Sequence, residues 1–169
     1  VSVVAGTNIS AQTGSAVVFE TSNTVRIGGN YDSANDRVVF AYRDDGDSDK
    51  LKAVVGTVSG TSISFGSEVE ISGAFTGPTV ESIPVGFDSV NNKILVVFDD
   101  AASSGQLRAI AGTVSGTSIS FGSEATVSTN SIPSSAIAFD PSAGKFLIVY
   151  KDATNSNYGK ARVATISGT

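Results

Sequence analysis

The chain has 169 residues, of which 40% are hydrophobic and 16% are charged, so it can bury a core as a single domain. It contains no cysteine and no histidine, which excludes disulfides, thiolate nucleophiles, Ser-His-Asp triads and imidazole metal ligands. The net charge of −5 and the isoelectric point near 4.5 argue against a nucleic-acid partner, and no apolar run is long enough to predict a membrane partner.

The chain is built from repeats. The segment GTVSGTSISFGSE occurs at residues 56–68 and again, letter for letter, at residues 112–124. Shorter matches to its start lie at residues 1–7 and 163–169. The sequence therefore predicts three repeats and the start of a further one, at residues 1–54, 55–110, 111–162 and 163–169.

Each repeat is predicted to form four strands, because Gly, Ser, Thr and Val dominate and turn-rich clusters separate short apolar runs. In the second repeat, a first strand at 83–87 is followed by a run of five apolar residues at 94–98. Such an unbroken run predicts burial on both faces, and equivalent runs lie at 38–42 and 146–150. A third strand follows at 107–114 and ends in a Ser-Gly-Thr turn.

The fourth strand alternates apolar and polar residues, as at 62–71, so one of its faces should contact water. Its first copy, at 8–19, is two residues longer, and this even insertion keeps Ile9 and Phe19 on the same face. Antiparallel units of this kind describe the blades of a β-propeller. A β-sandwich would explain the strands equally well, but not a repeat of 52 to 56 residues, which is close to kelch-like spacing. The predicted fold is therefore all-β, a propeller-like array of four-stranded antiparallel blades.

One loop is a candidate metal site. Four carboxylates surround a single glycine there, and carboxylate oxygens are the ligands that Ca²⁺ prefers, although the spacing lacks the distal glutamate of an EF-hand. The residues are Asp44, Asp45, Asp47 and Asp49. The alternative is a solvated loop, because only the first aspartate recurs in the other repeats. No other cofactor is expected.

Candidate ligand-binding residues lie near the ends of the third strands. Lys52, Arg108 and Arg162 recur at one position, where they form a solvated row or face an anionic sugar. By register Tyr31, Tyr42 and Tyr150 belong to the core. Tyr158 follows Asn155 and Asn157 in a loop and is the remaining aromatic that could stack on a ligand.

A second recurring set flanks the hairpin between the first two strands. It pairs Asp32 with Arg37, Asp88 with Lys93, and Asp140 with Lys145. The aspartate is expected to accept hydrogen bonds from backbone amides of the turn. An ion pair across the turn would add only about 0 to 1 kcal/mol.

The motifs Tyr31-Asp-Ser, Tyr150-Lys-Asp, Asn155-Ser-Asn-Tyr-Gly and GTVSGTSISFGS together resemble tandem repeats of large structural and tail-fibre-like proteins of marine bacteriophages. The resemblance covers the whole chain, and the first copy departs most from it, with Ala11-Gln-Thr in place of Phe-Gly-Ser. It implies a virion or extracellular location and transfers no catalytic residue.

Three functions are open on the sequence. The favoured one is a non-enzymatic structural and adhesive module whose loops bind a host glycan or a protein. The second is a glycan-cleaving propeller, for which Asp99 and Asp100 with the Asp44 loop are the candidate carboxylates. The third is an excised or designed repeat fragment without a ligand.

The repeat count also predicts self-association. Propellers typically have four to eight blades, so three blades should leave an apolar sheet face and unpaired strand edges exposed at each end. The turn at 167–169 precedes a fourth strand, and residues 8–19 of the same chain or of another copy can supply that strand. We therefore expect a homo-oligomer by strand exchange, favouring a dimer of six blades, with a filament as the alternative if the rotation does not close.

Overall fold

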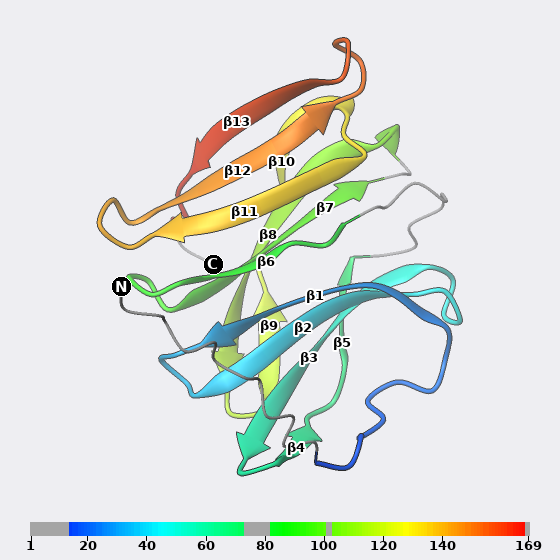
Figure 1. Ribbon diagram of the computed structural model, residues 1–169, viewed down its shortest axis with the longest axis vertical. Helices are drawn as coiled ribbons and strands as arrows, with labels where there is room; N and C mark the ends of the chain where they lie inside the picture. Colours follow the sequence, from blue (N-terminus) through cyan, green and yellow to red (C-terminus); the bar gives the residue numbers. More distant parts are fainter. Residues whose placement is uncertain (1–13, 73–81, 101–102, 168–169) are drawn as a thin grey trace, which may run out of the picture.

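The structure is a computed structural model that describes residues 14–72, 82–100 and 103–167. About 63% of these residues lie in strands and none lies in an α-helix, which confirms the all-β prediction. The strands form three antiparallel sheets, stacked in chain order along the long axis of the molecule (Figure 1).

The first sheet contains β1 (Thr24–Asp32), β2 (Arg37–Asp44), β3 (Lys50–Ser59), β4 (Ser62–Phe65) and β5 (Val69–Ser72). The second contains β6 (Val85–Asp88), β7 (Lys93–Asp100), β8 (Gln106–Ser115), β9 (Ser118–Phe121) and β10 (Ala125–Ser131). The third contains β11 (Ser134–Asp140), β12 (Lys145–Asp152) and β13 (Tyr158–Ala164).

The second and third strands pair in the same register in all three sheets. Val38 on β2 is opposite Gly56, Ile94 on β7 is opposite Gly112, and Phe146 on β12 is opposite Ala164. The predicted fourth strand is present in the first two sheets but is divided in two, because β4 and β5 both pair with β3, and β9 and β10 both pair with β8.

The division falls at the Phe-Gly-Ser motif. The amide of Gly66 still donates to the carbonyl oxygen of Val55, at 2.9 Å, so the chain stays attached to β3 across the break. A Cβ atom on Gly66 would collide with the carbonyl oxygen of Thr117, in the turn of the second sheet. The glycine therefore permits a close approach between the two sheets at this point.

The core consists of two apolar layers, and the second sheet separates them. On β7, Ile94, Val96 and Phe98 pack toward the first sheet, whereas Leu95 and Val97 pack toward the third. This confirms the prediction that the run 94–98 is buried on both faces.

The same prediction is wrong for the run 146–150. Phe146, Ile148 and Tyr150 are buried against the second sheet, but Leu147 and Val149 are 44% and 40% exposed. Among the described residues, no further sheet packs on the outer face of the third sheet. The run 38–42 is intermediate, because Val38 and Phe40 are half-buried on the outer face of the first sheet.

The hairpin turns use their aspartates as predicted. Asp32 accepts hydrogen bonds from the amides of Ala34 and Asn35, and Asp88 and Asp140 make the same pair of bonds. Of the partner cations, Arg37 donates to the carbonyl oxygen of Gly116, and Lys93 and Lys145 donate to threonine hydroxyls.

The N-terminal segment was predicted as a strand at 8–19. Residues 8–13 lie outside the described part of the chain, and residues 14–19 are not in a strand. They lie against the first sheet, where the ring of Phe19 is 5.2 Å from that of Tyr42 and 5.4 Å from that of Phe65. Tyr42 is buried as predicted, but Tyr31 is 50% exposed and donates to Asp36, so its assignment to the core is wrong.

Candidate functional site

The densest group of charges in the described residues is centred on Lys52 of β3. Its ammonium lies 2.8 Å from Asp44, 2.8 Å from Glu68 and 3.0 Å from Asp47. Both Lys52 and Asp44 are buried. We call Lys52, Asp44, Asp47 and Glu68 the Lys52 cluster.

Strand pairing builds this cluster. Asp44 ends β2 and Lys52 is on β3, directly opposite Tyr42. Glu68 immediately precedes β5, which pairs with β3 so that Glu70 is opposite Lys52. The cluster therefore joins three neighbouring strands of the first sheet at one end.

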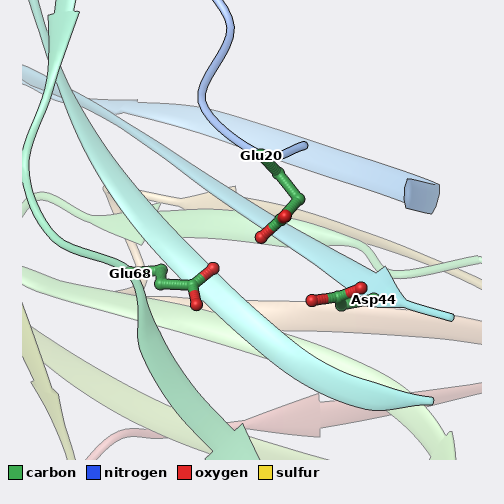
Figure 2. Close-up of side chains that lie close together, drawn as sticks. All are labelled: Glu20, Asp44 and Glu68. Carbon is green, nitrogen blue, oxygen red and sulfur yellow. The ribbon is translucent and has the colours of Figure 1, made fainter. Parts of the chain in front are cut away.

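A carboxylate trio overlaps the cluster. Figure 2 shows Glu20, Asp44 and Glu68, whose nearest oxygens all lie within 4.8 Å of one another. Three carboxylates this close would normally repel or hold a cation. Here the ammonium of Lys52 supplies the positive charge to two of them, and Tyr42 donates its hydroxyl hydrogen to Glu68 at 2.8 Å.

One further oxygen each of Asp44 and Glu20 accepts hydrogen bonds from backbone amides. One oxygen of Asp44 accepts from the amides of Gly46 and Asp47, at 2.9 and 3.1 Å. One oxygen of Glu20 accepts from the amides of Thr21 and Ser22, at 2.7 and 2.8 Å. The trio is thus stabilised by the chain itself.

The pKa values in this region follow from these contacts. Burial lowers the pKa of Lys52, but its hydrogen bonds to Asp44, Glu68 and Asp47 outweigh that effect and hold the pKa above its ordinary value. The pKa of Glu20 is lowered to about 2, chiefly by the hydrogen bond from the backbone amide of Ser22 and secondly by a side-chain hydrogen bond with Glu68. Burial and the bond to Glu68 raise the pKa of Tyr42. At neutral pH, Lys52 and Glu20 are therefore charged and Tyr42 keeps its proton.

The four aspartates of the predicted metal loop do not converge. Asp45 and Asp49 pair with Arg43, at 2.6 and 3.0 Å, whereas Asp47 pairs with Lys52 and Lys50. Only Asp44 belongs to the carboxylate trio, which is the single such group among residues 14–72, 82–100 and 103–167. Sequence reasoning missed Glu20 and Glu68, because nothing in the spacing of residues 20, 44 and 68 indicates that they meet. Calcium binding at the loop stays a prediction.

The cluster has counterparts in the other sheets. Asp100 lies 3.6 Å from Arg108, which occupies the position of Lys52. Asp152 is buried and accepts from Lys160 at 2.6 Å and from Asn130, a residue of the second sheet, at 2.7 Å. The bond from Lys160 is the main reason that the pKa of Asp152 lies below its ordinary value. A paired carboxylate at the end of the second strand is therefore a structural element of all three repeats.

The predicted ligand-binding residues fall into separate places. Asn155, Asn157 and Tyr158 share the exposed turn that enters β13, and Tyr158 is 60% exposed. Asn157 borders a shallow hollow of about 570 Å³, whereas Arg162 lines a different groove. Arg162 donates to the hydroxyl of Tyr150 at 3.4 Å, and Arg108 donates to Thr126 at 3.0 Å.

No family model matches the chain, and a search of curated proteins finds no relative. Within the part of the chain that the structure describes, no helix is long and apolar enough to span a bilayer.

Proposed function

We propose that this protein is a non-enzymatic structural and adhesive module, a propeller-like array of three blades whose loops bind a glycan or a protein. The observation that carries the proposal is that the carboxylates at the ends of the second strands pair within the protein itself. The aspartates at the ends of the second strands, Asp44, Asp100 and Asp152, each pair with a cation of their own sheet. Asp44 and Asp152 are buried, and Asp44 also accepts from a backbone amide.

The stacking of the sheets supports the propeller-like arrangement. The first strands contact one another in order, β1 with β6 and β6 with β11, as the innermost strands of blades do around an axis. Glycines permit these contacts, because a Cβ on Gly28 would collide with the carbonyl oxygen of Ile83. A Cβ on Gly86 of β6 would lie 2.9 Å from the Cδ1 atom of Ile137 on β11.

A glycosidase is less well supported. It needs one carboxyl group that holds a proton near neutral pH and a second that is free to act as nucleophile or base. Among the described residues, the one group of three carboxylates within 4.8 Å of one another is Glu20, Asp44 and Glu68, and the pKa of Glu20 is lowered to about 2 rather than raised. Asp44 is buried, and both of its oxygens accept hydrogen bonds. Asp99 is also buried.

The resemblance to phage structural repeats suggests the setting, an appendage of a virion or a secreted surface protein. There the turn that carries Asn155, Asn157 and Tyr158 would be available to a host glycan, because an exposed tyrosine ring can stack on a sugar face while the neighbouring amides hydrogen-bond its hydroxyl groups.

A glycan array, with a parallel assay for released reducing ends, tests this function. We expect binding without hydrolysis, and loss of binding in Tyr158→Ala. Tyr31→Ala is the matched control, since Tyr31 is also half exposed but lies on the first sheet. Release of reducing ends would favour the glycosidase. Absence of any binding would favour a purely structural repeat fragment, and equal binding by Tyr158→Ala would exclude this turn as the site.

A further inference from the structure

The third sheet has an open edge. In the first two sheets, the strand pairs β4–β5 and β9–β10 complete the sheet beyond its third strand, but in the described part of the chain β13 has only β12 as a neighbour. A groove of about 490 Å³ lies along this edge. Its walls come from the second sheet, with Ala109 and Val127, and from the third, with Ile148, Val163 and Ile166.

The N-terminal segment, residues 14–20, occupies the matching position at the other end of the molecule. Aligned with the fourth strand of the first sheet, Gly14 corresponds to Gly66 and Phe19 to Ile71. A Cβ on Gly14 would collide with the carbonyl oxygen of Thr61, just as one on Gly66 would collide with that of Thr117.

The apolar contacts repeat as well. Phe19 packs on Tyr42 and Phe65 of the first sheet. Ile71 belongs to the apolar layer that contains the equivalent residues of the second sheet, Phe98 and Phe121. The N-terminal segment thus lies on the first sheet as β5 lies on the second. It occupies the position of the outer strand of a further sheet, and the described residues contain no other strand of that sheet.

The two outer faces also correspond. On the third sheet, the exposed Leu147 and Val149 occupy the positions of Leu95 and Val97, which pack between the second and third sheets. On the first sheet, the half-buried Val38 and Phe40 occupy the positions of Ile94 and Val96, which pack between the first and second sheets. Each outer face therefore has the side chains of a sheet-to-sheet interface.

We infer that the β13 edge of one copy pairs with residues 14–20 of a second copy, so that the third sheet of the first copy packs on the first sheet of the second. In this pairing, residues 14–20 of the second copy would lie in the groove and take the position that β5 has in the first sheet and β10 in the second. This inference depends on the sheet geometry and is independent of the adhesive role proposed above.

The register of the contact follows from the complete sheets. Lys52 is opposite Glu70 and Arg108 is opposite Thr126, and the equivalent residues are Arg162 on β13 and Val18 in the N-terminal segment. Arg162 should therefore lie directly opposite Val18 of the second copy. Val18 is exposed in the single copy, so it is available for this pairing.

Disulfide trapping tests the register, because the chain contains no cysteine. We expect the double variant Val18→Cys with Arg162→Cys to form, under mild oxidation, disulfide-linked dimers or longer ladders that reducing agent dissolves. The control, Val18→Cys with Val90→Cys, places the second thiol on an exposed residue of the turn between β6 and β7 and should stay uncross-linked.

Two results would overturn the inference. One is a disulfide formed within a single chain, seen as a monomer with altered gel mobility and no free thiol, which would mean that the segment pairs with its own β13. The other is that the variant Val18→Cys with Arg162→Cys keeps all its thiols free, as the control does at the same protein concentration. A glycan-binding defect would affect neither readout, so failure here is separate from failure of the proposed function.

Discussion

At the scale of single residues, Lys52 is the side chain whose removal should lower the stability of the fold most. Its charge offsets the carboxylates of Asp44 and Glu68, and the side chain of Asp44 is buried. Removing one partner of a buried ion pair leaves an uncompensated charge and typically costs about 3–5 kcal/mol. We therefore expect Lys52→Met to lower the free energy of unfolding by about this amount, measured by urea denaturation.

The neighbouring Lys50→Met is the matched control. Lys50 also contacts two carboxylates, those of Asp47 and Glu70, but its side chain is 31% exposed. An exposed pair of this kind contributes about 0–1 kcal/mol. Equal losses in the two variants would mean that the burial of the Lys52 cluster has no energetic consequence.

Asp152 should make the stability depend on pH. Its hydrogen bond from Lys160 lowers its pKa in the folded state below the ordinary value, so the unfolded chain binds a proton first as the pH falls. The stabilisation is complete above the unfolded pKa of about 3.9 and is lost as the pH falls through the folded pKa. We expect the urea midpoint to decrease between about pH 5 and pH 2, and to decrease less in Asp152→Asn.

At the scale of elements, the strands themselves were predictable because their signals are local. Turn residues, apolar runs and the alternation at 62–71 each depend on neighbours in sequence, and the structure has strands at these places. Burial of the run 146–150 was not predictable in this way. The same pattern of five apolar residues is buried on both faces of β7 but on only one face of β12, because burial depends on which sheets lie next to the strand.

The candidate site illustrates the same limit. Asp44 was singled out, because acidic residues crowd its loop, but its actual partners Lys52 and Glu68 come from β3 and from the residue before β5. Their meeting depends on strand register, which the spacing of charges does not encode. The Ser-Gly-Thr and Phe-Gly-Ser motifs did recur visibly, but only the structure reveals that a glycine of one touches a threonine of the other.

That glycine contact between sheets leads to a prediction for an element. Gly66→Ala places a methyl group against the backbone carbonyl of Thr117, so the first two sheets must separate locally. Overpacking of this kind costs about 1–3 kcal/mol. Gly159→Ala is the control, because nothing lies within 4 Å of its added Cβ, and it should change stability by less than about 0.5 kcal/mol. Thermal or urea unfolding measures both, and similar losses would show that the contact is not tight.

At the scale of the whole molecule, the repeat places equivalent side chains on every sheet, so each sheet is built to be covered on both sides. Within the part of the chain that the structure describes, only the second sheet is covered in this way. The outer faces carry Leu147 and Val149 at one end and Val38 and Phe40 at the other. An array of this kind gains buried apolar area whenever a further sheet is added, which favours assembly over a single copy.

Two such contacts between two copies would close a ring of six sheets with two-fold symmetry, and three is half of a common blade number. We therefore expect the solution mass, measured by light scattering, to equal two chains and to fall toward one chain on dilution. Leu147→Glu should remove the dimer, because a carboxylate would be buried in the contact between the third and first sheets. Val90→Glu makes the same change at a residue that is 58% exposed in a turn of the second sheet, and it should leave the dimer intact.

A mass that grows without limit as concentration rises would mean that the contacts propagate as a filament. A mass of one chain at every concentration would contradict both forms of assembly.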